Sequence, residues 1–333
     1  MRRRFSRNIG LIVLLVAIPP AVLGALSVGA AGIPLKQLLA QFVSGGGTVE
    51  HTILFRLRLP RSVLALAAGG ALSLSGVLLQ GLFRNPLVAP YTLGISGGAA
   101  LGVALAIVTG LATALSLALP VAGFTGALLV VALIYGLNAS RRIRDVQGML
   151  LMGVMISFMA SSLFMLVTAL SRSEDLNGII FWIMGSLDEP HLWLVYGLAV
   201  ISVLGLGVSY LFVRELNAMA LGEQDAHHLG VDVDRARTRL FLLASLLTGV
   251  TVSVTGVIGF VGLVVPHFIR MVFGGDHRYV LAASFMGGAL FLLACDVIAR
   301  LIIAPLELPI GVITGLVGGA LFVTALVQKR RGI

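Results

Sequence analysis

Long apolar runs separated by short polar turns cover almost the whole chain. A hydrocarbon core about 30 Å thick is crossed by roughly 20 apolar residues in a helix. Runs of about that length lie near residues 9–31, 60–82, 91–110, 119–138, 148–170, 193–213, 240–258, 280–304 and 310–327. A shorter, glycine-rich run at 259–270 fits a half-length span. The pattern predicts an all-α integral membrane protein of ten transmembrane helices in one domain, residues 1–333.

Basic residues fall mostly on one side of this predicted topology. With the N-terminus inside, 17 of the 23 Lys and Arg residues lie on inner segments. The other six are Lys36, Arg56, Arg58, Arg61, Arg172 and Arg300. Short cytoplasmic loops carry such an excess of positive charge. The bias predicts that both termini are cytoplasmic, and it favours ten crossings because nine would place the C-terminal Lys-Arg-Arg outside.

Composition excludes a soluble protein. Only 11% of the residues are charged and 58% are apolar, whereas soluble domains are about 25% charged. The net charge of +9 is too thinly spread for a nucleic-acid surface, so no nucleic-acid partner is expected. The single cysteine, Cys295, rules out a disulfide framework. The six histidines lack the spacing of a chelating motif, and no metal site is predicted. The first apolar run lacks a short core followed by an Ala-x-Ala-like site, and we interpret it as a retained span rather than a signal peptide.

The second and seventh spans resemble each other at an offset of 180 residues. Gly-Gly-Ala-Leu-Ser-Leu-Ser-Gly-Val at 69–77 matches Gly-Val-Thr-Val-Ser-Val-Thr-Gly-Val at 249–257. The repeat starts five helices later, so the copies cross in opposite directions. Chance similarity among small residues is the alternative. An inverted repeat joining the second–fifth and seventh–tenth spans is typical of transporters.

Glycines recur every four residues in two spans. They are Gly94, Gly98 and Gly102 in the third, and Gly311, Gly315 and Gly319 in the tenth. Small residues at this spacing let helix backbones approach closely in a membrane. We expect both faces to be helix-packing surfaces.

The sequence has no phosphate-binding loop of its own. Such a loop needs Gly-Lys-Ser/Thr at the start of a helix, and the only lysines, Lys36 and Lys329, follow Leu and Gln. A partner would have to bind ATP and Mg. The longest inner loop, 214–239, offers a place for that partner. Its segment 216–229 can form a short helix with Met219, Ala220, Ala226 and Leu229 as apolar contacts, ended by Gly230. A plain surface loop is the alternative.

Several motifs, spread in order over almost the whole chain, resemble one family of importer permeases. They are Arg-Leu-Pro-Arg at 58–61, the small residues at 73–76, Asn-Pro-Leu at 85–87, Leu-Gly at 221–222, Leu-Gly-Val at 229–231, Gly-Phe-Val-Gly-Leu-Val-Val-Pro-His at 259–267, Asp-His-Arg at 276–278, Asp-Val-Ile-Ala-Arg at 296–300 and Glu-Leu-Pro-Ile-Gly at 307–311. The chain is similar to the FecCD-type (type II) ABC importer permeases for iron-siderophore, haem and vitamin B12 uptake.

The resemblance implies a bacterial cytoplasmic (inner) membrane protein that binds no cofactor and is not itself an enzyme. Its implied partners are a second permease copy (a homodimer or close heterodimer), two cytoplasmic ATP-binding subunits, and a periplasmic or lipid-anchored substrate-binding protein. Iron-siderophore is the expected cargo, with haem and cobalamin as alternatives. It also implies that the 214–239 loop couples to the ATPase, through Leu221, Gly222, Ala226, Leu229 and Gly230.

Three arginines are candidates for contact with the binding protein. In similar permeases, arginines at the positions of Arg58, Arg61 and Arg300 meet carboxylates of that partner. Arginine pairs carboxylates directionally, although the first two could instead anchor in headgroups. Arg300 also lies four residues after Asp296, the spacing of an intrahelical ion pair. No gate residue is assigned, because Asp-Val-Gln at 145–147 departs from the small hydroxyl residues of similar permeases.

Two other functional classes compete with an ATP-driven importer. A secondary transporter driven by an ion gradient also uses inverted repeats, but it usually needs intramembrane carboxylates, and only Asp296 qualifies. An integral membrane enzyme needs titratable groups clustered at one depth, and the sequence shows no such cluster.

Overall fold

A computed structural model describes residues 2–29, 49–140 and 146–330, and within these ranges all regular structure is helical. The principal helices are α1 (Arg2–Ser27), the continuous α3–η1–α4 (Val49–Thr52, Ile53–Arg58, Leu59–Phe83), α5 (Ile95–Val108), α7 (Ala118–Ser140), α8 (Val146–Leu170), α10 (Leu192–Tyr210), α13 (Val233–Thr255), α14 (Val261–Phe273), α15 (His277–Leu301) and α16 (Ile310–Arg330). Short helices connect them: η2 (Pro90–Leu93), α6 (Leu111–Ala114), α9 (Ser173–Ile183), α11 (Val213–Met219) and α12 (Glu223–His228).

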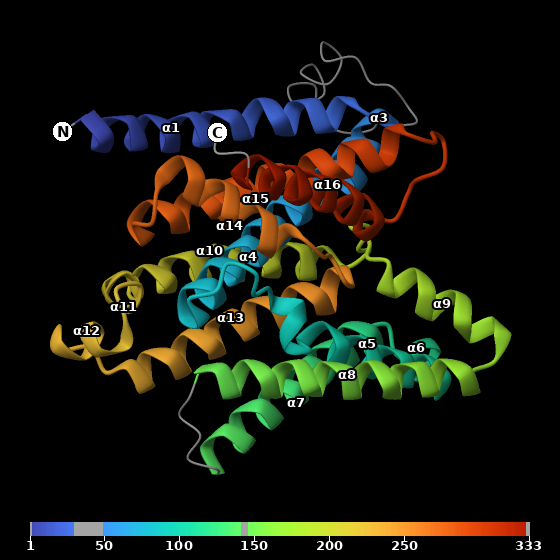
Figure 1. Cartoon of the computed structure of the whole chain (residues 1–333). Coiled ribbons are helices and arrows are strands. Elements are labelled where there is room, and N and C mark those ends of the chain that lie inside the picture. Colours follow the sequence, from blue (N-terminus) through green and yellow to red (C-terminus); the bar gives the residue numbers. More distant parts are fainter. Residues whose placement is uncertain (1, 30–48, 141–145, 331–333) are drawn as a thin grey trace.

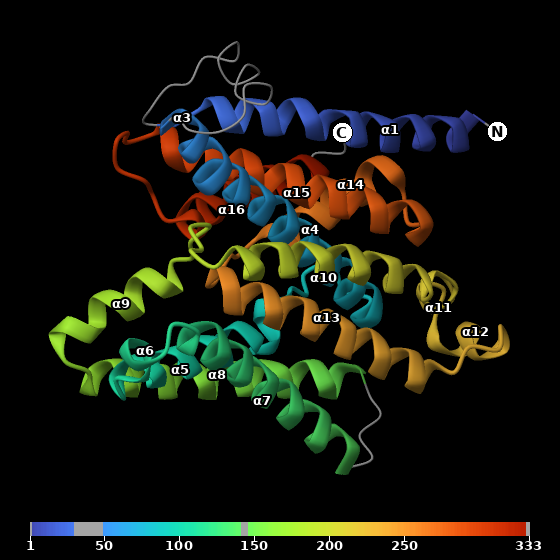
Figure 2. The same ribbon diagram turned by 180° about the vertical axis from the view of Figure 1, so that it is seen from behind.

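The ten principal helices match the ten predicted spans. Seven are long and apolar enough to cross a membrane, and α5, α14 and α16 are shorter apolar helices over their described residues. The helices run roughly parallel to one direction and alternate in sense along the chain (Figures 1 and 2). The start of α1, α11 and α12 lie at one end, called here the α12 end. The helix α9 and the turn before α16 lie at the other, the α9 end.

Several helix bounds differ from the apolar runs because polar residues fix where a helix begins. The seventh span was expected from 240, but α13 begins at Val233, where the Asp232 side chain accepts a hydrogen bond from the backbone N–H of Arg235 at 3.1 Å. Such an N-cap satisfies a donor left free at a helix start. The second span extends outward to Val49 through a π-helical turn. The helix α9 had no counterpart in the predicted spans.

The inverted repeat is visible in the packing. The helices α4 and α13 run in opposite directions (Figures 1 and 2) and touch where Ser75 Oγ lies 2.7 Å from Thr248 Oγ1. α4 packs against α14 and α15, whereas α13 packs against α5 and α7. The first helix of each repeat therefore packs on the second and third helices of the other repeat. This exchange is what two inverted copies produce, and it confirms the predicted architecture.

The glycine face of α5 lies against α7. A Cβ on Gly98 would lie 2.5 Å from the carbonyl oxygen of Gly126, and one on Gly102 would meet the carbonyl oxygen of Ala122. Gly94 precedes α5 with a φ of 77° and faces Ser157 of α8.

The expected face of α16 needs a correction. Gly311 does pack closely, on the carbonyl oxygens of Met184 and Val257, but no atom lies within 4 Å of a Cβ at Gly315. Gly319 has only an ordinary contact with Phe260, 3.8 Å away. The close contact comes instead from Gly318, whose Cβ would lie 2.6 Å from the Cβ of Phe260. The position of Phe260, in the segment just before α14, therefore determines which glycine of α16 makes the close contact.

Replacing Gly98 by Val should lower the melting temperature of the purified protein. The new side chain would meet the Gly126 backbone, and overpacking typically costs about 1–3 kcal/mol. Gly136→Val is the matched control, because Gly136 lies exposed on α7 with no atom within 4 Å of a Cβ. Equal melting temperatures for the two variants would contradict close packing of α5 on α7.

Candidate functional site

The segment between α10 and α13 forms two short helices instead of the single helix expected over 216–229. The chain breaks between α11 and α12 at Gly222, which has a φ of 142°. Only glycine adopts this backbone conformation at little cost. A single helix assumed over 216–229 therefore predicted the wrong side for some residues after Gly222.

Ala226 was expected to contact a partner, but it is fully buried and belongs to the same apolar core as Leu216 and Met219. Two other residues of the expected coupling set, both leucines, are exposed instead. Leu221 is 66% exposed and Leu229 is 51% exposed. Exposed apolar side chains beside a groove are a common sign of a protein–protein contact.

Gly230 ends α12, as the sequence predicted. Its φ is 76°, its N–H donates to the His227 carbonyl at 2.9 Å, and the N–H of Val231 donates to the Ala226 carbonyl at 3.0 Å. These two bonds form a Schellman motif. Arg237 of α13 holds α12 in place: its Nη2 pairs with the Oε1 of Glu223 at 2.8 Å. The segment is thus a defined structure and not a loose surface loop.

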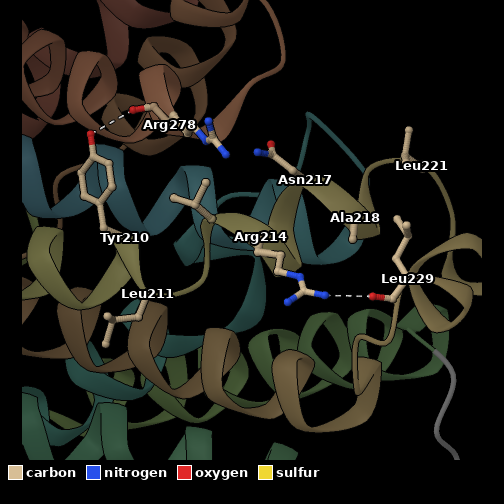
Figure 3. A pocket seen from close by; sticks show the side chains of 9 residues that line it. Tyr210, Leu211, Arg214, Asn217, Ala218, Leu221, Leu229 and Arg278 are labelled. Atoms are coloured by element: carbon tan, nitrogen blue, oxygen red, sulfur yellow. Dashed lines mark hydrogen bonds between the residues drawn. The ribbon is translucent and has the colours of Figure 1, made fainter.

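A groove of about 770 Å³ lies beside these helices at the α12 end. It is lined by Tyr210, Leu211, Val213, Arg214, Asn217, Ala218, Leu221, Leu229 and Arg278. Figure 3 shows Leu221 and Leu229 on one side of it and Arg278 on the other. Arg214 Nη2 donates to the Leu229 carbonyl at 3.1 Å, which ties α11 to the end of α12. The groove therefore presents apolar and cationic groups together.

At the α9 end, four charged side chains form a balanced cluster. The Asp296 carboxylate is completely buried and contacts Arg300 Nη2 at 2.9 Å and Arg61 Nε at 2.8 Å. Arg61 Nη1 also contacts Glu307 Oε2 at 2.5 Å. The Arg300 contact is the ion pair expected from the i, i+4 spacing, although its atoms lack hydrogen-bond alignment. Two arginines and two carboxylates neutralise one another here.

The arginines expected to dock a partner are mostly turned inward. Arg58 Nη1 donates to the Leu26 carbonyl at 2.7 Å, and Arg300 Nη1 donates to the carbonyls of Ala25 at 3.2 Å and Val28 at 3.0 Å. Both are buried, and Arg61 is only 16% exposed. These residues hold α1 to α4 and α15 because the last carbonyls of α1 lack partners within their own helix. The exposed arginine of this segment is Arg56.

Two further features concern the remaining expectations. Within the described ranges, no group of three or more His, Cys, Asp or Glu residues is placed to hold a metal ion. The inner turn at 145–147 begins outside the described residues, and α8 starts at Val146.

Sequence reasoning missed a polar cluster at the groove. Asn217 of α11 bonds to Asp276 and His277 at the start of α15. A second missed contact joins Gln80 of α4 to Arg270 of α14. A polar residue close to an apolar run was the only available signal, and it does not show which distant segment will meet it.

Comparison with known proteins agrees on one family. Residues 13–328 match the FecCD transport family. The chain is 39% identical to the haemin transport system permease HmuU of Yersinia pestis, covering 99% of this chain and 98% of that protein. It is 37% identical to the Fe(3+) dicitrate permease FecD of Escherichia coli, covering 94% and 96%. A solved metal-chelate type ABC transporter in an inward-facing conformation superposes with a TM-score of 0.84 at 30% identity, covering 97% and 99%.

Proposed function

The chain belongs to the FecCD transport family, and we propose that it works as the permease of an ATP-driven importer for an iron chelate. It is a permease of the metal-chelate ABC type. The observation that carries the mechanism is the α11–α12 pair, which exposes Leu221 and Leu229 beside a groove at one end of an inverted repeat. We propose that this pair docks into a cytoplasmic ATPase, because short helices with exposed apolar anchors suit a partner's groove.

ATP would be bound and hydrolysed by that partner. The sequence has no Gly-Lys-Ser/Thr loop, so ATP and Mg belong to the ATPase subunits. We propose two such subunits, one for each copy of a permease homodimer. The permease contributes no catalytic residue; its contribution is to convert movement of the ATPase into opening of a path between the repeats.

The α12 end is the cytoplasmic end in this proposal. Support comes from the exposed arginines there: Arg214, Arg235, Arg239 and Arg278. Positive charge next to membrane spans favours the cytoplasmic side. Both termini would then be cytoplasmic, in a bacterial inner membrane.

The α9 end would receive a substrate-binding protein. We propose that Arg56 and the half-exposed Glu307 meet that partner directly, while Arg61 positions Glu307. Arg58 and Arg300 support the surface from inside. This division follows burial: Glu307 is 49% exposed, whereas Arg58 and Arg300 are buried.

Arg56→Glu should weaken binding of the substrate-binding protein, chiefly by slowing association, because complementary charge steers encounter. The effect should shrink as salt rises, since exposed charges are screened over about 10 Å at 0.1 M ionic strength. Surface plasmon resonance at low and high salt measures both. Arg235→Glu makes the same charge change at the α12 end and should have no effect. Equal association rates for the Arg56 variant and wild type at low salt would contradict the proposed docking.

Iron-siderophore is the proposed cargo, with haem as the second candidate because of the 39% identity to a haemin permease, and cobalamin third. Uptake into proteoliposomes containing the permease, its ATPase and its binding protein tests the three directly. Ferric citrate, haemin and cobalamin serve as probes. ATP-dependent uptake of an iron chelate supports the proposal, and uptake of cobalamin alone contradicts its cargo.

An ion-gradient-driven transporter is the other class. Asp296 is the only buried acidic residue in the described part of the chain, and two arginines already contact it. Because both contacts are with arginines, this carboxylate is not an open ligand for a coupling cation.

A further inference from the structure

Asn217 joins the helix pair at the groove to the start of α15. Its Oδ1 accepts hydrogen bonds from the backbone N–H of His277 at 3.0 Å and from the His277 ring Nδ1 at 2.9 Å. Its Nδ2 donates to Asp276 Oδ1 at 3.2 Å. One side chain on α11 therefore contacts both residues at the N-terminus of a membrane-spanning helix.

These contacts complete the cap of α15. The Asp276 carboxylate accepts from the Arg278 N–H at 3.1 Å, and Asn217 satisfies the N–H of His277. The first N–H groups of a helix have no partner within it, so a buried helix start depends on side chains that supply one. Here one of them comes from a different segment, and it lies on the groove wall with Leu221 and Leu229 (Figure 3).

The helix α15 carries this attachment across the molecule. It packs along α4, with Gly288 so close to Gly69 that a Cβ on either would meet the other's carbonyl oxygen. Such a contact leaves little room for the helices to slide separately. At its far end α15 holds Asp296, which binds both Arg61 of α4 and Arg300 of its own helix. A helix fixed at both ends moves as one body.

A second contact lies near the same helix start. The His277 ring is buried, and its Nε2 would lie 3.3 Å from a Cβ on Gly81. The neighbouring residue Gln80 accepts from Arg270 of α14 and donates to the Gly262 carbonyl at 3.1 Å. The start of α15 thus adjoins the attachment of α14 to α4, and α14 is the short span of the second repeat.

We infer that Asn217 is a positioning residue for coupling: it transmits displacement of the α11–α12 pair to α15, and through α15 to the cluster at the α9 end. The inference rests on the proposed function, because it assumes that an ATPase moves this pair. It adds a specific residue and a specific helix to that function. Asn217 touches neither ATP nor cargo.

The test compares two variants that each remove contacts from the same helix start. Asn217→Ala removes the link from α11. Arg7→Ala removes the cation–π contact in which the Arg7 Cζ lies 5.5 Å from the centroid of the Tyr279 ring. This link comes from α1 and involves neither the groove nor the α11–α12 pair. A merely structural role predicts similar effects for both, whereas transmission predicts a loss for Asn217→Ala alone.

The readout is the number of iron chelate molecules taken up per ATP hydrolysed. It is measured in proteoliposomes that contain the full complex and are supplied with ferric citrate or haemin from outside. We expect Asn217→Ala to lower this ratio at least about fivefold, the lower range of coupling between sites, with ATPase binding unchanged. Arg7→Ala should leave the ratio within about twofold of wild type, as one partly exposed cation–π contact contributes only weakly. An unchanged ratio in Asn217→Ala, or an equal fall in both variants, would overturn the inference.

A double variant checks that Asn217 acts through the α15 cap. Residues that work through one contact have non-additive effects, so Asn217→Ala with Asp276→Ala should lower the ratio no further than the worse single variant. Multiplied losses would contradict the route through α15. Failure of the proposed function looks different: the wild-type protein itself would then bind no ATPase, or take up its cargo without ATP.

Discussion

Asp296→Ala should destabilise the protein by about 3–5 kcal/mol, the usual cost of removing one partner from a buried ion pair. Asp296 is completely buried and contacts Arg61 and Arg300. Without it, the cluster keeps two arginines against the single carboxylate of Glu307. Arg300 is buried, and in the variant no carboxylate is in contact with it. We expect a much lower melting temperature in detergent and a lower yield of monodisperse protein.

The control for this variant is Glu307→Gln. Glu307 also pairs with Arg61 but is half exposed, and exposed ion pairs contribute only about 0–1 kcal/mol. Its melting temperature should stay close to that of the wild type. If Asp296→Ala proved as mild as Glu307→Gln, the cluster would not hold α4 to α15, and α15 could not move as a body fixed at both ends.

The double variant Leu221→Asp, Leu229→Asp should abolish stable binding of the ATPase. Both leucines are exposed at the groove, and neither is needed to fill the core. Interface anchors typically contribute about 2 kcal/mol or more each, so a loss of affinity on the order of a hundredfold or more is expected. Copurification of the ATPase with tagged permease, followed by titration in detergent, measures it.

His228→Asp is the matched control. It places a new negative charge at an exposed position of α12, between the two leucines in sequence, and leaves both leucines in place. Binding of the ATPase should fall little. A wild-type affinity in the double leucine variant would mean that the partner docks elsewhere on the α12 end.

The sequence was a good guide to the spans because membrane physics acts on each span separately. A run of apolar residues predicts a helix whatever its neighbours, and α14 was recognised although it is short. Gly98 and Gly102 predicted a close contact for the same reason, since only small residues permit one. The ion pair of Asp296 with Arg300 followed from spacing within a single helix.

Contacts between distant segments could not be read in this way. The sequence places Arg58 just before the second span. Whether its guanidinium faces a partner or the end of α1 depends on where α1 stops, which the sequence does not show. The sequence predicted that Ala226 faces outward. It is buried instead, because the break at Gly222 turns α12 relative to α11. Nothing in the sequence showed what Asn217 contacts, because its partners lie 59 and 60 residues away. The fold was predictable from local patterns, whereas the functional surfaces depend on tertiary packing.

Purification of the complex tests the central claim most directly. The permease should be tagged and extracted in mild detergent from cells that also express the proposed ATPase and binding-protein partners. Reconstituted vesicles should then be supplied with an iron chelate, with ATP or with an ion gradient. The account predicts that the ATPase copurifies with the permease and that uptake requires ATP. A permease that purifies alone and accumulates its cargo with an ion gradient and no ATP would contradict it.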